Sequence, residues 1–116
     1  MATDGTIQSR IFQTQFRAMG IEAFIPDKPY QKMVMDLIYK DVKAGNPADL
    51  NKFQQVSEHL RGQGAQVIIL GCTELSLIKR EFPIGAGYLD AMEILAQRSI
   101  LRCQGRIKKK YEHLIT

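Results

Sequence analysis

The sequence predicts a single α/β domain built on a parallel sheet. Helical and strand-like segments alternate along the 116 residues, which is the pattern of a layered α/β structure. Residues 67–70 (VIIL) are β-branched or aliphatic throughout, as expected of a central parallel strand that is buried on both faces. Hydrophobic residues make up 45% of the chain and charged residues 24%, so the composition excludes global disorder.

The first half of the chain predicts two helices and a short strand. Apolar residues spaced three and four positions apart predict a helix over residues 7–19, ended by Gly20. The same spacing predicts a longer helix over residues 28–44, ended by Gly45. Residues 21–25 (IEAFI) between the two helices predict a short strand.

The second half predicts three more helices around the central strand. Asn46 and Pro47 are expected to begin the next helix directly, because proline is favoured in a first helical turn. A short helix is expected around residues 75–78, after the strand at residues 67–70. Asp90 is expected to cap a last helix that continues through Ile107.

The first residues of the chain read as the end of a strand-to-helix turn. Residues 1–6 (MATDGT) lead into a predicted helix, but no strand comes before them. A doubly wound sheet begins with a buried strand, so the predicted sheet lacks its first strand. Residues 1–6 also lack the basic and apolar regions of a signal peptide, which places the protein in the cytoplasm as an expectation.

Charge and cysteine content narrow the classes of partner. The 16 basic and 12 acidic residues give a net charge of +4, and the two cysteines are too few for a disulfide framework or a four-thiolate zinc site. The longest strictly apolar run is four residues, so no membrane span is expected. A basic cluster near the C-terminus is interpreted as a solvated helix face, not a nucleic-acid surface, because no aromatic residues are interleaved for base stacking. This cluster consists of Arg102, Arg106, Lys108, Lys109 and Lys110.

Cys72 is the residue with the clearest chemistry. It follows the predicted buried strand and opens the next helix, and ligands of open α/β sheets bind at the carboxyl ends of strands. Free N–H groups at a helix N-terminus stabilise a thiolate, and Thr73 adds a hydroxyl for an anionic ligand. Glu74 places near the sulfur a carboxylate that can orient or exchange a proton but also opposes thiolate formation. A buried, inert cysteine is the alternative interpretation of this placement.

Two further positions attract attention in the sequence. Residues 3–6 (TDGT) form a second strand-to-helix turn, which either holds a carboxylate or phosphate through backbone N–H groups or serves as an ordinary N-cap. Lys43, at the end of the long predicted helix, reads on its own as a surface lysine that pairs with the helix dipole. His59 and His113 have no companion at ligand spacing, so no metal site is expected.

Four segments together resemble one known family of enzymes. Residues 67–77 (VIILGCTELSL) closely resemble the second cysteine motif of the aspartate/glutamate racemase family. Three other segments are similar, in chain order, to the start of that family's second domain, its helix end with a substrate-side lysine, and the opening of its last helix. These segments are residues 2–7, 38–45 and 90–96.

The resemblance implies a flavodoxin-like three-layer domain over residues 1–116 and an enzyme that uses no cofactor. In that family, two similar α/β domains face each other across a cleft, and each supplies one cysteine to one face of the substrate α-carbon. One thiolate removes the α-proton and the opposite thiol returns a proton, which is the acid–base pair that inversion requires. The implied activity is an amino-acid racemase for a small acidic amino acid, with aspartate favoured.

The resemblance also assigns site residues. Cys72 becomes one of the two catalytic cysteines, and Thr73 and Glu74 line the same turn. Thr6 is implied to hold the substrate α-carboxylate, and Lys43 to meet its side-chain carboxylate.

The chain departs from the family pattern at two places. It has no counterpart of the first-domain cysteine motif, and Cys103, in the predicted last helix, does not replace it. Residues 85–87 (GAG) are unlike the short strand expected before Asp90. We therefore expect the chain to work with a first racemase domain or as a homo-oligomer, and to be inactive alone. The alternatives are a non-catalytic carboxylate- or partner-binding remnant, or a related cysteine-dependent decarboxylase or isomerase, including enzymes that act on malonates, maleate or hydantoins.

Overall fold

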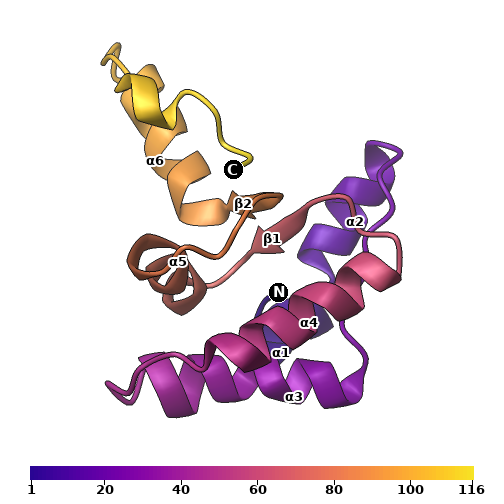
Figure 1. Cartoon of the computed structure of the whole chain (residues 1–116). Coiled ribbons are helices and arrows are strands. Elements are labelled where there is room, and N and C mark those ends of the chain that lie inside the picture. The colour runs from indigo at the N-terminus through magenta and orange to yellow at the C-terminus, as the bar shows by residue number, and fades with distance from the viewer.

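The computed structural model describes residues 1–116 and confirms a mixed α/β fold. Figure 1 shows α3 and α4 together as one layer, the two strands in the middle, and α6 with the C-terminal segment standing away from that layer. In chain order, the elements are α1 Asp4–Ser9, α2 Ile11–Ala18, α3 Lys28–Asp36, the π-helix η1 Leu37–Val42, α4 Leu50–Gly62, β1 Ile68–Leu70, α5 Thr73–Glu81, β2 Tyr88–Asp90, α6 Ala91–Arg102 and the 3₁₀ helix η2 Lys109–Tyr111.

The sheet consists of β1 and β2, which run parallel with α5 as the crossover between them. Their register pairs Ile68 with Tyr88 and Leu70 with Asp90. The predicted central strand is therefore confirmed, and β2 forms although the glycines before it made a strand there doubtful. Parallel strands end at the same edge of a sheet, so the residues after β1 and β2 lie on one side of the molecule.

Terminal residues extend the hydrogen bonding on both edges of this sheet. The nitrogen of Met1 donates to the carbonyl of Ile69 at 2.7 Å, and the N–H of Gly71 donates to the carbonyl of Met1 at 2.9 Å. On the other edge, Tyr88 and Thr116 exchange two backbone hydrogen bonds of 2.9 and 3.1 Å. Residues at both ends of the chain therefore pack beside the strands.

The core lies between one face of the sheet and the helices α3, η1, α4 and α5. Phe53 and Tyr88 place their ring centroids 5.5 Å apart, and the Tyr88 hydroxyl donates to Ser57 Oγ at 2.8 Å. Ser57 Oγ in turn donates to the carbonyl of Phe53 at 2.9 Å, so both of these hydroxyls are paired. The core cluster consists of Val34, Leu37, Ile38, Phe53, Val56, Leu60, Ile68, Leu70, Leu75, Ile78 and Tyr88.

Two predictions for the first quarter of the chain are wrong. The helix predicted over residues 7–19 is two helices, α1 and α2, because Arg10 takes the left-handed conformation with a φ of 57°. Residues 21–25 form no strand. Ile21 and Ile25 are exposed, and the segment hydrogen-bonds to neither strand of the sheet, so strand propensity alone does not produce a strand here.

The long helix predicted over residues 28–44 changes character half-way. It is α-helical in α3. In η1, each hydrogen bond spans five residues, which is the π pattern, and Lys43 N–H donates to the carbonyl of Ile38 at 2.9 Å. The next helix begins at Leu50 and not directly after Pro47, because Asp49 caps it by accepting hydrogen bonds from the first-turn N–H groups.

The last helix is shorter than predicted. It ends at Arg102, so Ile107 lies outside it. Gln104 adopts a φ of 57°, and Gly105 N–H donates to the carbonyl of Ile100 at 2.9 Å. This is the Schellman arrangement, which satisfies the last carbonyls of a helix. None of the helices combines the length and the apolar character that a membrane crossing requires.

Candidate active site

Cys72 lies between the carboxyl end of β1 and the first turn of α5. It is the N-cap residue of α5, with extended backbone angles, and its side chain is half-buried against the core cluster. Gly71 before it lets the first residues of the chain come close: a Cβ at this position would lie 3.3 Å from the Cβ of Ala2 and from the carbonyl oxygen of Met1. Cys103, in contrast, is exposed at the end of α6.

One carboxylate oxygen organises the start of α5. The Cys72 thiol donates to Oε2 of Glu74 at 2.9 Å, and the Thr73 hydroxyl donates to the same oxygen at 2.8 Å. An oxygen that accepts two hydrogen bonds is best supplied by an ionised carboxylate. The structure therefore brings together three of the residues selected from the sequence, in a state with a protonated sulfur and a charged Glu74.

The resting protonation state of Cys72 results from opposing effects. Burial raises the pKa of Cys72 to about 11, and the hydrogen bond to Glu74 acts in the same direction. The backbone N–H groups of Glu74 and Thr73 lower that pKa, as expected at a helix N-terminus, but they are outweighed. The prediction of a thiolate stabilised by the helix is therefore wrong for this structure, and the opposition expected from Glu74 is confirmed.

Glu74 is stabilised as an anion. The hydrogen bond from Cys72 and then that from Thr73 hold the pKa of Glu74 below its usual value, and the positive charge of Lys43 adds to this effect. Lys43 directly follows the π-helix η1, which packs against α5. Its Nζ lies 4.9 Å from the ring centroid of Tyr39, and its side chain is exposed. The structure therefore places the charge of Lys43 within electrostatic reach of the Cys72–Glu74 pair.

Thr6 is arranged differently. It belongs to α1, where Thr3 is the N-cap and accepts from the N–H of Thr6 at 3.3 Å. The two threonine hydroxyls are 3.0 Å apart and hydrogen-bonded. Residues 3–6 thus form an N-cap, and the hydroxyl of Thr6 makes no hydrogen bond to Cys72, Thr73 or Glu74.

Asp90 and Ser76 connect the ends of the two strands. Asp90 is buried at the end of β2 and accepts hydrogen bonds from Ser76 Oγ at 2.7 Å and from Met92 N–H at 2.8 Å. Ser76 also lies one turn after Cys72 in α5, with its Oγ 3.4 Å from the Cys72 carbonyl oxygen. Sequence reasoning identified Asp90 as a cap but missed this link, because it depends on the register between β1 and β2.

A second connection holds α5 against α6. Lys79 and Glu93 form an ion pair of 2.7 Å, and both side chains are largely shielded from solvent. The positions that support Cys72 are therefore fixed by side-chain contacts between three consecutive elements, α5, β2 and α6.

His59 lies away from Cys72. Its ring stacks on the ring of Tyr30 with a centroid distance of 3.9 Å, and its Nε2 accepts a hydrogen bond of 3.1 Å from the N–H of Asp27.

Comparison with known proteins shows the family of this chain. The family model for Asp/Glu/hydantoin racemases matches residues 1–98. The chain belongs to this family. It is also similar to an uncharacterized protein in the pnlA 3′ region of Pectobacterium carotovorum subsp. carotovorum, which is 35% identical over 103 residues, covering 86% of this chain and 68% of the relative. Membership of this racemase family confirms the resemblance seen in the sequence and supports a racemase-type function.

Proposed function

We propose that this chain supplies one half of the active site of a cofactor-independent amino-acid racemase. The substrate is an acidic amino acid, with aspartate favoured, and Cys72 is one of the two groups that exchange the α-proton. The observation that carries the proposal is the Cys72 thiol hydrogen-bonded to Glu74 at the carboxyl end of β1, in a chain of the racemase family.

The chemistry follows from the resting protonation state. With a pKa of about 11, Cys72 holds its proton at neutral pH and is ready to give it to the carbanion at the substrate α-carbon. The S–H bond breaks, a C–H bond forms on that face, and the sulfur becomes a thiolate. In the reverse direction the thiolate removes the α-proton, and its high pKa makes it a strong base.

The charges around Cys72 support an acidic amino acid as substrate. Lys43 offers an exposed cation for the side-chain carboxylate, and its charge already acts on Glu74. Thr73 and Glu74 line the turn beside the sulfur, and Thr6 is proposed to hold the α-carboxylate. The Thr6 hydroxyl is hydrogen-bonded to the Thr3 hydroxyl in this structure, and when Thr3 is the donor, Thr6 keeps its own proton for the substrate carboxylate.

Inversion needs a second acid–base group on the opposite face of the α-carbon. We propose that a first racemase domain supplies it. A second copy of this chain is the alternative, which Cys72-dependent inversion by the chain alone would identify. The chain alone is then expected to bind the substrate but not to interconvert its enantiomers.

Substrate protection of Cys72 tests the binding half of this proposal. In a Cys103→Ser background, only Cys72 remains to react with iodoacetamide, and aspartate is expected to slow its alkylation while alanine at the same concentration does not. Lys43→Met is expected to abolish the protection, whereas Lys108→Met, a change in the C-terminal segment, leaves it intact. Equal protection by alanine and aspartate would contradict an acidic-substrate site.

Proton exchange tests the catalytic half. The α-proton of aspartate is followed by NMR in deuterated water, with and without an added first-domain racemase fragment. Exchange and inversion are expected only in the mixture, and Cys72→Ser should remove them while Cys103→Ser should not. Exchange that survives Cys72→Ser would reject Cys72 as the acid–base group.

A further inference from the structure

Asp90 is a buried carboxylate at the junction of β2 and α6. It is the last residue of β2 and the N-cap of α6, and it is 3% exposed. One of its oxygens, Oδ1, accepts two hydrogen bonds, from Ser76 Oγ at 2.7 Å and from Met92 N–H at 2.8 Å. Capping α6 needs only the second bond, which serine, threonine or asparagine could also accept without burying a charge. The bond to Ser76 is therefore the part of this arrangement that capping does not explain.

Ser76 connects this carboxylate to the turn that carries Cys72. Its single hydroxyl proton goes to Asp90, because Asp90 Oδ1 lies 2.7 Å from Ser76 Oγ and the Cys72 carbonyl oxygen lies 3.4 Å away. The backbone N–H of Ser76 donates to that same carbonyl at 3.2 Å. Ser76 therefore holds Cys72 through its backbone and Asp90 through its side chain.

The start of α5 depends on this link because it has no side-chain cap. Cys72 is the N-cap residue, but its thiol accepts no hydrogen bond from the first turn. The thiol and the Thr73 hydroxyl both donate to Glu74, within the same turn. These bonds hold the turn together but do not attach it to the sheet. The bond between Ser76 and Asp90 is the side-chain contact that joins this turn to a strand.

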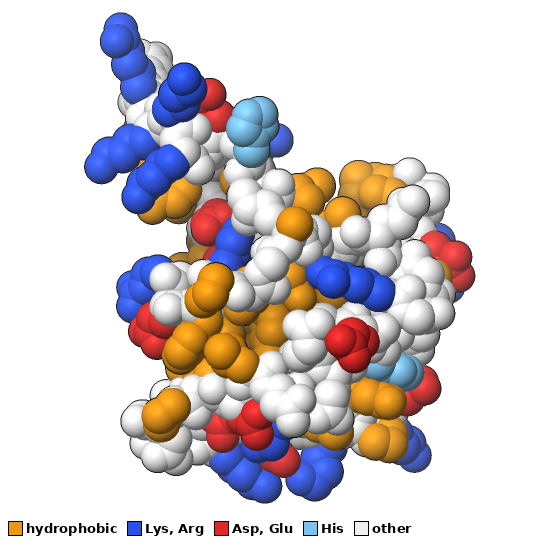
Figure 2. Space-filling view, in the orientation of Figure 1, with side chains coloured by type: hydrophobic (Ala, Val, Ile, Leu, Met, Phe, Trp, Pro, Cys, Tyr) orange, Lys and Arg blue, Asp and Glu red, His pale blue; other side chains and the backbone are white.

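A second link, one turn later in α5, supports the first. Lys79 and Glu93 form an ion pair of 2.7 Å between α5 and α6. Ser76 and Lys79 are three residues apart, so they lie on the same face of α5. Both links lie at the base of α6, which projects with the C-terminal segment from the body of the molecule (Figure 2). The helix after Cys72 is therefore held at two points against the end of β2 and the start of α6.

We propose that Asp90 is a positioning residue for the Cys72 site and that it acts through Ser76. It fixes the first turn of α5 relative to the end of β2, and with it the place of the Cys72 sulfur. A reacting group that is misplaced by about 1 Å can lose about a hundredfold in rate, so a fixed turn favours proton transfer. This catalytic consequence rests on the proposed function, whereas the effect on the position of the sulfur does not.

Variants at both ends of the link test the proposal, in the Cys103→Ser background. Ser76→Ala removes the hydroxyl and leaves the cap of α6, whereas Asp90→Ser keeps an oxygen for Met92 N–H but is too short to reach Ser76. Each change should free the first turn and expose the sulfur. Because burial is the largest cause of the raised pKa of Cys72, that pKa should fall from about 11. Iodoacetamide alkylation at pH 8 should then accelerate about threefold or more, which corresponds to about half a pKa unit.

Matched controls separate this effect from a general loss of structure. Ser76→Thr keeps the hydroxyl for Asp90, so the pH profile of Cys72 alkylation should stay that of the parent. Ser99→Ala removes a hydroxyl that donates to the carbonyl of Leu95 on the exposed side of α6, and it should leave the profile unchanged. The double variant of Ser76→Ala and Asp90→Ser should match either single variant, because both remove the same bond. Circular dichroism reports folding, and the two Ser76 variants decide if Asp90→Ser does not fold.

Proton exchange at the α-carbon of aspartate, with the first-domain fragment added, measures the catalytic consequence. Ser76→Ala should lower kcat by about tenfold or more and leave KM nearly unchanged, because the proposed substrate contacts of Lys43 and Thr6 remain. A Cys72 alkylation profile that Ser76→Ala leaves unchanged would overturn the positioning role. Exchange that persists in Cys72→Ser would reject the proposed function instead, and the alkylation profile would still decide the role of Asp90.

Discussion

The two faces of the small sheet are covered very differently, although adjacent residues of the same strands form them. On one face, Ile68, Leu70 and Tyr88 are at most 2% exposed and join the core under α3 and α4. On the other face, Val67, Ile69 and Leu89 are only half-buried and line an apolar groove of about 770 Å³. The chain therefore completes one layer of an α/β structure with its own residues and leaves apolar surface on the other.

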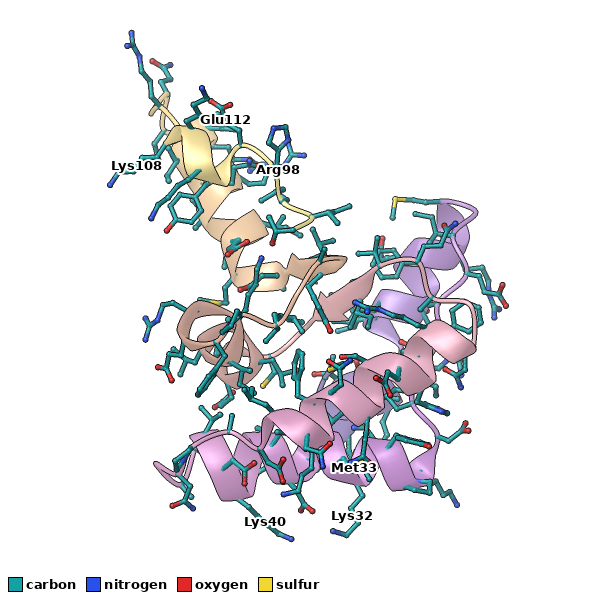
Figure 3. All side chains as sticks on the ribbon, in the orientation of Figure 1. Lys32, Met33, Lys40, Arg98, Lys108 and Glu112 are labelled. Atoms are coloured by element: carbon teal, nitrogen blue, oxygen red, sulfur yellow. The ribbon has the colours of Figure 1, made fainter.

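The candidate active site depends on the complete layer. Cys72 packs against the core cluster, and the π-helix before Lys43 contributes Leu37 and Ile38 to the same cluster. Figure 3 shows Lys32 and Lys40 on the outer side of that layer, whereas Arg98, Lys108 and Glu112 belong to the separate C-terminal part. The side chains of the candidate site are thus supported by the part of the fold that is most buried.

The largest expected effect is a loss of stability, which differs between two neighbouring isoleucines. Ile68→Ala removes a fully buried side chain and should lower the free energy of unfolding by about 2–5 kcal/mol, because a cavity forms in the core. Ile69→Ala, one residue further on, should cost about 1 kcal/mol or less, because its side chain is already partly in solvent. Urea unfolding measures both, and similar losses at the two positions would show that the groove face is covered in solution.

A smaller effect concerns the Cys72 thiol. Glu74→Gln removes the negative charge that raises the pKa of Cys72, so the pKa falls toward the ordinary value of 9.0 and the thiolate fraction at pH 8 rises. Each unit by which the pKa falls is worth about tenfold in thiolate, so alkylation should accelerate, although burial, the largest cause of the raised pKa, remains in this variant. The control is Glu58→Gln on the exposed side of α4, which should leave the rate unchanged. In the unaltered protein the rate should keep rising with pH up to about 11.

A modest loss of stability is expected when the buried pair of hydroxyls is broken. Tyr88→Phe removes the donor to Ser57, while Ser57 keeps its own hydrogen bond to the carbonyl of Phe53. The cost should be about 1 kcal/mol, the usual net value of a hydrogen bond. Thermal unfolding measures it. A loss several times larger would mean that Tyr88 also fixes the position of α4 on the sheet.

The smallest effect lies on the outer side of the complete layer. Hydrogen bonds from Lys40 and then Lys32 lower the pKa of Asp36 to about 2 from the ordinary 3.8. A lowered carboxyl pKa stabilises the fold above pH 4, and this contribution disappears as the pH falls from 4 to 2. Asp36→Asn should therefore reduce the melting temperature slightly at pH 7 and not at pH 2. Because the two lysines are exposed, the change should shrink in high salt.

The same two faces explain which parts of the fold could be predicted from the sequence. Residues 67–70 were recognisable as a strand because they are apolar without interruption and are followed by Gly71 and Cys72, which mark the turn into a helix. Residues 21–25 are also apolar apart from Glu22, but they pair with no strand. Whether a segment finds a strand to pair with depends on the whole fold and not on its own composition. The three-residue strand β2 was doubtful for the opposite reason, since its pairing with β1 outweighs the glycines before it.

Within the candidate site, the residues were easier to predict from the sequence than their protonation and local backbone geometry. The sequence placed Cys72, Thr73 and Glu74 on one turn, and the structure joins them by hydrogen bonds. It did not decide the protonation of Cys72, because burial and Glu74 oppose the backbone N–H groups and only coordinates show which effect is larger. The π-helix before Lys43 was also missed, because apolar residues spaced for an α-helix do not reveal one extra residue in a turn.

That extra residue determines the angular position of everything after it. An α-helix rotates by about 100° per residue, so winding the same residues of η1 with α-helical hydrogen bonds would rotate Lys43 about the helix axis by roughly that angle. Its ammonium would leave the side that faces Glu74, while Val34 and the other core residues of α3 would keep their places. The π turn therefore decides which charge faces the Cys72 site, and a single-residue deletion that converts it to an α-helix should keep Lys43 on that side.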